Sequence, residues 1–433
     1  MIPRYSHDKL VRLWSDAHRL SVWLKVEIAV TEAWEERGLA PAGTAARLTE
    51  RASTLDTAAL AVRQSELEQT TQHDVIAFLQ ACEEQLGDDA RWLHFGMTSS
   101  DVVDTAFALL LREAGAEVLA ALDGLLAALR ERALEHKRTP CLGRTHGQAA
   151  EPTTFGLKLL SAFAELSRGR ARLVAALEEL RFGKIAGAVG NYGNVPPDVE
   201  ERALRGLGLQ VEPVATQVVP RDRHAVFFNA LAVIGGGVER LAVEVRHLQR
   251  TEVKEAFEPF GKGQRGSSAM PHKKNPILSE NLTGMARLLR SYAAAALEDI
   301  ALWHERDISH SSVERVIGPD ATTLLHFALL RAERLVRGLV VDPARMAQNL
   351  AAAGEIVGSG AVLLALVEKG AMRQEAYGWV QRCALAGTDF RAALKADPEV
   401  GARLAATDVD RLLSVENHLQ HVDAMFARVL AAR

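Results

Sequence analysis

Apolar and polar residues alternate with a helical period along most of the chain, and four stretches sustain it for unusually long. They are residues 101–137, 151–180, 223–257 and 275–317. Pro140 stops the first stretch, and Pro152 suits the first turn of the second. Helices of roughly 30–40 residues exceed the usual globular length and need long neighbours to pack against. The pattern therefore predicts an elongated helical bundle.

Composition supports helix nearly everywhere. Ala, Leu, Glu and Arg dominate, aromatic residues make up only 5%, and runs of β-branched residues are scarce. Gly354, Gly358 and Gly360 mark a boundary before a smaller C-terminal helical region. The predicted fold class is all-α.

Charge and cysteine usage exclude several classes of protein. Lys+Arg 51 against Asp+Glu 55 gives a net charge of −4, which does not indicate binding to nucleic acid or to an acidic membrane. Cys82, Cys141 and Cys383 are far apart, which argues against a disulfide framework and fits a reducing compartment. We find no signal peptide and no run of ~18 apolar residues, and we expect a cytoplasmic enzyme.

The histidines do not suggest a metal site. Of the 14 histidines, only His418 and His421 have close helical spacing, and no third ligand is indicated near them. We therefore expect no metal site.

The glycine-rich segment 261–276 reads GKGQRGSSAMPHKKNP. Gly261, Gly263 and Gly266 match the GxGxxG pattern of dinucleotide-binding folds. We reject that interpretation because no strand precedes the segment and no βαβ alternation surrounds it. A flexible loop between two long helices, able to close over a substrate, is the better interpretation.

The end of the same segment predicts an anion site. Asn275 can cap the next helix and Pro276 suits its first position, so Lys273 and Lys274 lie beside a helix N-terminus. Positive side chains and the positive end of a helix dipole favour a bound anion. The structural alternative is a solvated basic linker.

A second helix start, in segment 94–101, has similar features. Thr98, Ser99 and Ser100 precede the long helix, and their hydroxyls and backbone N–H groups can bind a carboxylate. Plain capping by Thr98 with Asp101 is the alternative. Two such sites together suggest a ligand with more than one carboxylate or phosphate.

His146 lies in the polar segment Arg144-Thr-His-Gly-Gln148, where it is poorly placed for core packing. A general acid or base is at least as good an interpretation as a solvated loop histidine.

Segment 303–315, WHERDISHSSVER, combines charges with a serine cluster. On a helix Ser311 and Arg315 share a face, as do Ile308 and Ser312. The charges could merely solvate a helix surface, although the serines argue mildly against this.

These segments together resemble the fumarase/aspartase superfamily of lyases. Its motif GSSxMPxKxNP stands at residues 266–276. Other segments resemble the branch of the superfamily that cleaves succinylated purine nucleotides: RTHGQ at 144–148, HxGMTSxD at 94–101, THD-like residues at 71–74, GAVGNYGN at 187–194, WHERDISHSSVER at 303–315 and the N-terminal Arg4-Tyr5. The chain departs from this branch at Gln72, where many relatives have arginine or asparagine.

The resemblance implies three all-α domains, which we place at 1–110 (N-terminal helical), 111–353 (central long-helix bundle) and 354–433 (C-terminal helical). It also implies a homotetramer whose central bundle is shared by four subunits. Each active site would then be assembled from three of them.

The implied reaction is elimination of fumarate from adenylosuccinate to give AMP, and from succinylated aminoimidazole carboxamide ribotide, in purine biosynthesis. By resemblance His146 is the general acid, Ser267 the base and His73 a second active-site histidine. The residues alone do not separate Ser267 from Ser268. No step requires a metal or redox cofactor, and the only partners expected are a small nucleotide and other copies of this chain.

The implied substrate-binding residues fall into groups. Those that stabilise negative charge on the succinyl part are Thr98, Ser99, Lys273 and Asn275. Those that hold the phosphate are Arg4, Tyr5, Ser311 and Arg315, and those that hold the rest of the substrate include Gln217 and Arg306. The remaining candidates are Asp74, Ser268 and Ser312.

Two alternatives stay open. A sister lyase or cycloisomerase, such as argininosuccinate lyase or carboxymuconate cycloisomerase, would share the 266–276 motif but has no evident use for the phosphate-binding arginines. A non-enzymatic helical scaffold is the other, because some members of the superfamily serve as lens structural proteins. The presence of Ser267, His146 and Lys273 together argues against the scaffold.

Overall fold

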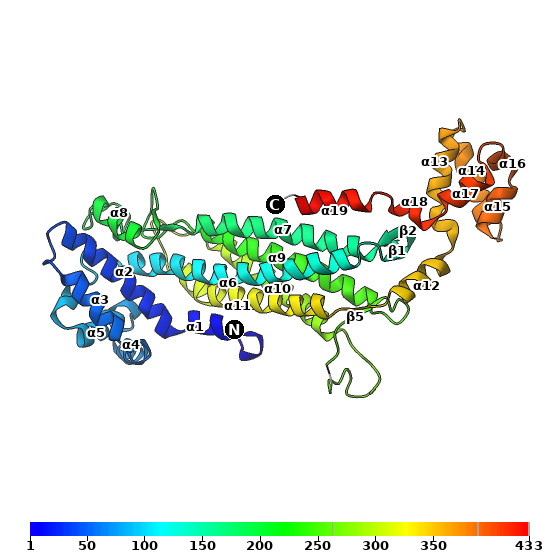
Figure 1. Cartoon of the computed structure of the whole chain (residues 1–433). Coiled ribbons are helices and arrows are strands. Elements are labelled where there is room, and N and C mark those ends of the chain that lie inside the picture. Colours follow the sequence, from blue (N-terminus) through cyan, green and yellow to red (C-terminus); the bar gives the residue numbers. More distant parts are fainter. Residues whose placement is uncertain (262, 388, 432–433) are drawn as a thin grey trace. The chain divides into compact units, whose positions relative to one another are not determined.

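The computed structural model describes residues 1–261, 263–387 and 389–431. Helices make up nearly all of its regular structure, and strands occur in these residues only as three two-stranded sheets (Figure 1). The predicted all-α class is confirmed.

Five helices in the described part of the chain have 22 or more residues: α6 (Ser99–Glu135), α7 (Phe155–Glu179), α9 (Asp222–Leu248), α10 (Ile277–Glu298) and α11 (Ser309–Gly338). The shorter elements that bear on the site are η1 (Pro3–Tyr5), α2 (Asp16–Glu36), α4 (Thr57–Thr71), α5 (Asp74–Leu86), α12 (Pro343–Ala353), α13 (Ser359–Glu368), α14 (Arg373–Leu385) and α19 (Val422–Ala431). The strands are β1 (Pro140–Thr145) with β2 (Gln148–Thr154), β3 (Phe182–Gly183) with β4 (Gln210–Val211), and β5 (Ala256–Phe257) with β6 (Val340–Val341).

The chain divides into two compact units, and each of the five long helices contributes residues to both. Unit 1 comprises Met1–Gly124, Arg168–Glu239 and Leu282–Arg331, and unit 2 comprises Leu125–Ser167, Arg240–Asn281 and Ala332–Arg433. The three domains that we placed at 1–110, 111–353 and 354–433 stay a prediction.

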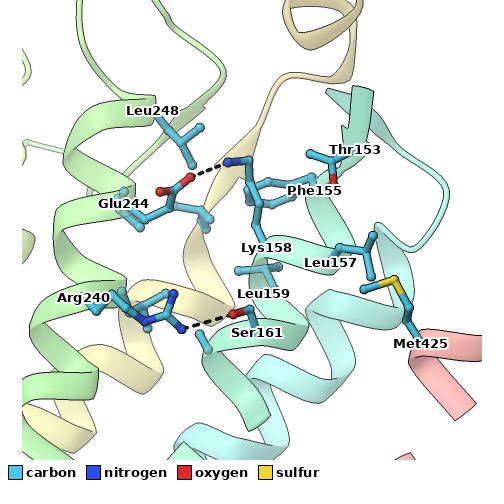
Figure 2. A pocket seen from close by; sticks show the side chains of 14 residues that line it. Thr153, Phe155, Leu157, Lys158, Leu159, Ser161, Arg240, Glu244, Leu248 and Met425 are labelled. Atoms are coloured by element: carbon cyan, nitrogen blue, oxygen red, sulfur yellow. Dashed lines mark hydrogen bonds and ion pairs between the residues drawn. The ribbon is translucent and has the colours of Figure 1, made fainter. Parts of the chain in front are cut away.

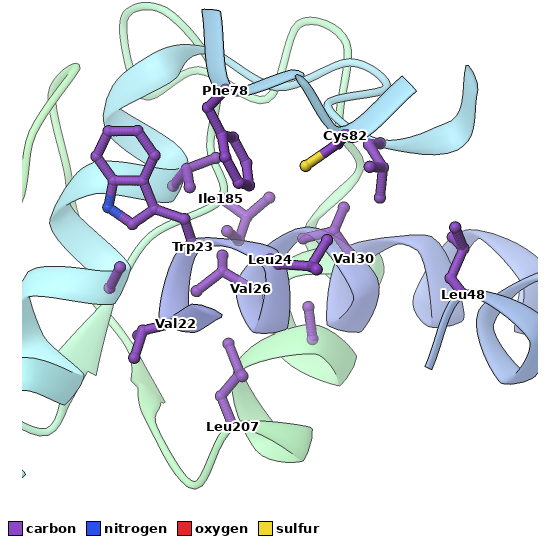
Figure 3. Close-up of a cluster of buried hydrophobic side chains, with 14 of the residues drawn as sticks. Val22, Trp23, Leu24, Val26, Val30, Leu48, Phe78, Cys82, Ile185 and Leu207 are labelled. Carbon is purple, nitrogen blue, oxygen red and sulfur yellow. The ribbon is translucent and has the colours of Figure 1, made fainter. Parts of the chain in front are cut away.

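The core of unit 1 is built around the apolar face of α2. The Trp23 ring packs edge-on against Phe78 of α5, with 5.5 Å between ring centroids. Val26 and Ile185 are fully buried in the same cluster (Figure 3). Small residues let the long helices of this unit approach closely: a Cβ on Gly115 of α6 would lie 2.4 Å from the Leu177 side chain of α7.

Unit 2 has a second core in its C-terminal helices, where Val362 and Leu366 of α13 are fully buried with Ala376 of α14. Earlier in the chain, the start of α7 contacts the end of α6 through backbone. A Cβ on Gly156 would lie 2.6 Å from the Ala133 carbonyl oxygen, so glycine is needed there.

The predicted helix 151–180 begins later than expected. Residues 140–154 form the antiparallel hairpin β1–β2, in which Pro152 pairs with Leu142. Helix α7 starts at Phe155, and the Thr154 hydroxyl caps it by accepting a hydrogen bond from the Leu157 N–H at 3.1 Å. The expectation that Pro152 opens the helix was wrong because proline is equally compatible with a hairpin strand.

The predicted helix 275–317 was also wrong, because two helices replace it. Helix α10 ends at Glu298 and α11 begins at Ser309. Asp307 stabilises this break: its carboxylate accepts hydrogen bonds from the backbone N–H groups of Ser309 and Trp303, both at 2.8 Å. Pro319 lies inside α11.

The predicted helices 101–137 and 223–257 agree more closely with the structure. Helix α6 matches the prediction for 101–137 within two residues at each end. Helix α9 ends early, at Leu248, and the chain then turns into β5. By length and composition α9 is apolar enough to cross a membrane, but 56% of its most apolar window is buried inside the fold, as in a core helix.

All three cysteines are buried. Burial raises the pKa of Cys141 to about 12 and that of Cys383 to about 11, and it also raises the pKa of Cys82.

Candidate active site

Arg315, Ser311 and Asp74 form a cluster in unit 1. Arg315 lies one turn after Ser311 on α11, and its Nε donates to the Ser311 hydroxyl at 3.3 Å. Its guanidinium also forms an ion pair with Asp74 at the start of α5. Burial raises the pKa of the Asp74 carboxyl, but the Arg315 charge more than offsets this and holds that pKa below its usual range. Arg315 is held by two partners yet remains 57% exposed, so it can still meet an anion.

His73 caps α5 beside this cluster. Its Nδ1 accepts a hydrogen bond from the Ile76 N–H at 3.5 Å and lies 3.6 Å from the Asp74 carboxylate. The ring is 42% exposed. Since Nδ1 is engaged by its own helix, Nε2 is the nitrogen that can meet a substrate.

Gln72, the residue that departs from the family pattern, ends α4 with a left-handed backbone (φ 51°). Its side-chain amide donates to the Gln69 carbonyl at 2.9 Å. The side chain therefore turns back onto its own helix.

The start of α6 combines binding groups with a buried anchor. The Thr98 N–H donates to the Asp101 carboxylate at 2.8 Å, and the Asp101 N–H donates to the Thr98 carbonyl at 2.9 Å. The contact between the Asp101 carboxylate and the Thr98 N–H is the capping that we gave as the plainer alternative for these residues. Ser99 opens the helix, and it and Thr98 are both half-buried.

Lys184 neutralises that anchor. Its ammonium forms an ion pair with Asp101, and both side chains are fully buried. The same carboxylate accepts hydrogen bonds from the N–H groups of Ala186 and Gly187 at 3.1 and 3.3 Å. The start of α6 is therefore tied to the GAVGNYGN segment. No local sequence motif singled out Lys184.

Arg306 and Gln217 are brought together as the implied substrate contacts require. The Arg306 guanidinium donates to the Gln217 side-chain oxygen at 2.8 Å. Gln217 in turn donates to the Ala188 carbonyl at 3.0 Å. Both side chains are half-buried, which leaves part of each accessible.

The N-terminal pair lies on η1, also in unit 1. Arg4 is exposed, and Tyr5 packs against Phe327 of α11 with 5.6 Å between ring centroids. Ser312, an exposed residue of the 303–315 segment, donates its hydroxyl to the Ser309 carbonyl at 3.1 Å.

His94 is a residue that we did not single out. Its backbone is left-handed (φ 61°), and its Nδ1 lies 2.8 Å from the carboxylate of the fully buried Glu27. Burial lowers the His94 pKa, but Glu27 outweighs this effect and raises the pKa above its ordinary value. A partly exposed histidine that favours its cationic form is suited to an anionic ligand. Its place at the head of the HFGMTSSD segment was the available signal.

A buried ionic cluster was also missed. Arg221 makes two hydrogen bonds to Asp104 of α6, at 2.6 and 2.9 Å, and one to Glu314 of α11 at 3.1 Å. Burial raises the pKa of Asp104, but Arg221 lowers it to a net value of about 2. Burial raises the pKa of Glu314 to about 7. Because Glu314 adjoins Arg315 in the chain, the cluster anchors the start of α11 to α6 within unit 1.

His146 lies at the tip of hairpin β1–β2 in unit 2. Thr145 pairs with Gln148, so His146 and Gly147 form a two-residue turn. Both have positive φ, 54° and 76°, as a type I′ turn requires. The imidazole is exposed, as expected for a residue that must reach a substrate.

Ser267 and Ser268 lie in the loop between β5 and α10, and Lys262 of this loop is outside the described residues. The Ser267 Oγ accepts hydrogen bonds from the N–H groups of Ala269 and Met270, at 3.3 and 3.1 Å. Ser268 is exposed. Two N–H donors aimed at one oxygen stabilise negative charge on it.

Gly266 sets the path of this loop. A Cβ there would lie 2.1 Å from the Lys273 carbonyl oxygen, a distance that a side chain cannot occupy. The two ends of the GSSAMPHK segment therefore touch through backbone.

The start of α10 differs from the prediction that Asn275 caps it. The carboxylate of Glu258 accepts hydrogen bonds from the N–H groups of Leu278 and Ser279, at 3.0 and 2.6 Å. Those N–H groups are therefore not available to a bound anion. Lys273, which is exposed, and Asn275, which is half-buried, remain as the polar groups before the helix.

A cavity of about 300 Å³ lies elsewhere in unit 2 (Figure 2). Its walls come from α7, α9 and α19, and two polar contacts cross it: Lys158–Glu244 at 2.8 Å and Arg240–Ser161 at 3.4 Å. None of the candidate site residues lines it. We therefore do not assign the chemistry to this cavity.

Comparison with known proteins gives a consistent result. The family model described as "Lyase" matches residues 4–289, and the model described as "Adenylosuccinate lyase C-terminus" matches residues 355–429. The chain is 49% identical to a Thermotoga maritima protein and 48% identical to a Deinococcus radiodurans protein, both named adenylosuccinate lyase, over 99% of each chain.

Solved structures agree on the fold. A fumarate lyase from Mesorhizobium sp. BNC1 is similar with a TM-score of 0.89 and 27% identity over 100% of both chains. A 3-carboxy-cis,cis-muconate lactonizing enzyme from Pseudomonas putida has a TM-score of 0.86 and 30% identity, covering 99% of this chain and 97% of its own.

Proposed function

The chain belongs to the adenylosuccinate lyase family, and we propose that it eliminates fumarate from adenylosuccinate to give AMP. The observation that carries this proposal is 44–49% identity over 99% of the chain to relatives named adenylosuccinate lyase. As a lyase of this family, it would also act on succinylated aminoimidazole carboxamide ribotide. We further propose a cytoplasmic location.

Ser267 is the proposed base. The reaction removes a proton from a carbon next to a carboxylate and leaves a dianionic aci-carboxylate. A serine hydroxyl is a weak base unless its anionic form is stabilised. The Ala269 and Met270 N–H groups that donate to the Ser267 Oγ supply such stabilisation and favour Ser267 over Ser268.

His146 is the proposed general acid for the leaving nitrogen. Histidine is the side chain that most often transfers protons in general acid–base catalysis. Its exposed position on a two-residue turn supports this role. The charge that develops on the succinyl part would be stabilised by Lys273 and Asn275 and by the start of α6 at Thr98 and Ser99.

The nucleotide phosphate is assigned to the arginine cluster of unit 1. Arg315, held by Ser311 and Asp74, would bind it together with Arg4 and Tyr5. Arg306 and Gln217 would hold the remainder of the substrate. His73, whose Nδ1 is engaged by its own helix, would orient the succinyl group through Nε2.

The competing activity is that of the 3-carboxy-cis,cis-muconate lactonizing enzyme, to which the chain is 30% identical. Purified protein should therefore be given adenylosuccinate and, separately, 3-carboxymuconate. We expect AMP and fumarate from the first, followed by ultraviolet absorbance and chromatography, and no turnover of the second. The opposite result would replace the proposed activity.

We also propose a homotetramer whose active sites are shared between subunits. Residues of different chains would then supply His146 and His73 to one site. Mixing equal amounts of dissociated His146→Ala and His73→Ala protein should restore activity at roughly a quarter of the sites, since each histidine is independently intact half of the time. Verified subunit exchange without recovered activity would contradict the shared site.

A further inference from the structure

A short stem, residues 249–258, carries two buried carboxylates that none of the roles above uses. Glu255 and Glu258 flank the two residues of β5, and they are 0% and 6% exposed. Within unit 2 each carboxylate holds a different catalytic segment. A buried carboxylate requires partners, so its contacts identify what it holds.

Glu255 holds the hairpin that carries His146. Arg144 donates to it in a forked ion pair, with Nη2 to Oε1 at 2.7 Å and Nη1 to Oε2 at 3.2 Å. Asn349 of α12 donates to the same Oε1 at 2.8 Å. Arg144 stands two residues before His146 on β1, and a forked pair restrains both the direction and the distance of the strand.

Glu258 holds the other segment. Its carboxylate accepts the N–H groups of Leu278 and Ser279, at the point where the Ser267 loop enters α10. Gln249 closes the base of the same loop: its oxygen accepts the Glu258 N–H at 2.9 Å, and its nitrogen donates to the Lys274 carbonyl at 2.9 Å. Both ends of the loop are therefore attached to the stem.

We propose that Glu255 and Glu258 are positioning residues, Glu255 for the turn that carries His146 and Glu258 for the loop that carries Ser267. The inference rests on the proposed function for the roles of those two groups. The stem then positions two segments of one chain. Glu255 positions the turn with the acid, and Glu258 positions the loop with the base. A misplacement of about 1 Å in such a group can cost up to about a hundredfold in rate.

The test compares Glu255→Gln, Glu258→Gln and the control Arg345→Gln. Arg345 donates to the carbonyls of Val253 and Glu252, so its loss loosens the same stem without touching either carboxylate. Hydrogen exchange of peptides 140–154 and 259–281 is measured by mass spectrometry, with kcat, KM and the melting temperature of each variant.

We expect Glu255→Gln to speed exchange in 140–154 and to lower kcat about tenfold with KM within about twofold. Glu258→Gln should do the same for 259–281 and leave 140–154 unchanged. Arg345→Gln should lower the melting temperature and reproduce neither pattern. Arg144→Gln should match Glu255→Gln, and the double variant should be no slower than either single one.

The outcomes separate the explanations. If Arg345→Gln reproduces both losses, or if each carboxylate variant loosens both segments equally, the residues are merely structural and the proposal is wrong. A fall in kcat without faster exchange in the assigned segment would also overturn it. If the wild-type protein does not cleave adenylosuccinate, the proposed function fails, whereas the exchange measurements still decide the positioning roles.

Discussion

The starts of α6 and α10 have similar signals in the sequence, yet they are built differently. At α6 the carboxylate that bonds the backbone comes from the helix itself, and Asp101 is buried with Lys184 as its counter-ion. At α10 the carboxylate comes from outside the helix, from Glu258, and the loop before the helix is largely exposed. The α6 start is buried within unit 1, whereas the described residues of the loop before α10 are held at both ends by contacts to Gln249 and Glu258 of unit 2. We therefore expect mutations of the buried Asp101–Lys184 pair to change stability and mutations of Ser267 in the loop to change catalysis.

The largest expected effect is on the loop side. Ser267→Ala should lower kcat by about 10²–10⁴, since a positioned base contributes that much. Steady-state kinetics measure the loss, and thermal melting should show no change, because Ser267 is not part of the core. Ser268→Ala, the neighbouring control, should lose less than about tenfold. Equal losses in the two variants would remove the distinction between the serines.

On the α6 side, Lys184→Met should lower the free energy of unfolding by about 3–5 kcal/mol, because it leaves Asp101 buried without a counter-ion. Urea unfolding followed by circular dichroism measures the change. The double variant Lys184→Met/Asp101→Asn removes the unpaired charge but keeps an acceptor for the surrounding N–H groups. It should therefore be more stable than Lys184→Met alone, and a further loss would contradict this account.

Arg315→Ala tests whether the Arg315 cluster of unit 1 acts in substrate binding, in contrast to the catalytic role of Ser267 in the loop. We expect KM for adenylosuccinate to rise by about 10- to 100-fold, as the loss of a charge-assisted contact to phosphate implies. A smaller change in kcat would accompany it if the phosphate helps to orient the succinyl group. Unchanged kinetics would return Arg315 to the role of a solvated surface residue.

The last prediction concerns pH. Burial raises the pKa of Glu314 from 4.5 to about 7, so the folded state holds a proton there that the unfolded chain has lost. Its contribution to stability is present below pH ~4.5 and is lost as the pH rises through ~7, with a slope of at most about 1.4 kcal/mol per pH unit. The lowered pKa values of His224 and His310, about 3 and 4, act in the opposite direction.

The difference between wild type and Glu314→Gln isolates the glutamate. Unfolding free energies should be measured for both proteins from pH 4 to pH 8. The difference should shift in favour of the variant as the pH rises through this range. A constant difference would mean that the Glu314 pKa is the same in the folded and the unfolded protein.

Local patterns predicted a large part of this molecule. The all-α class followed from composition and from the helical period along the chain. The start of α6 and the exposed position of His146 followed from neighbouring residues. What local patterns could not provide was pairing across the chain. Lys184 and Asp101 are 83 residues apart, and Glu27 and His94 are 67 apart, so no neighbouring residue indicates either pair.

The errors have the same physical origin. Pro152 is acceptable both in a first helical turn and in a strand, and the pairing of residue 152 with Leu142 decides between them. Asn275 is a good helix cap in isolation, but Glu258 supplies the acceptor at the start of α10. Local preference was in each case overridden by a tertiary contact.

The burial of all three cysteines has a practical consequence for spectroscopy. Because burial raises each thiol pKa, the wild-type protein should react slowly with maleimides and other thiol reagents near neutral pH. A single cysteine introduced at Met270, which is 51% exposed beside Ser267, would then be the one fast-reacting thiol. A fluorophore attached there would test, without removal of any native cysteine, the prediction that the loop opens and closes during turnover.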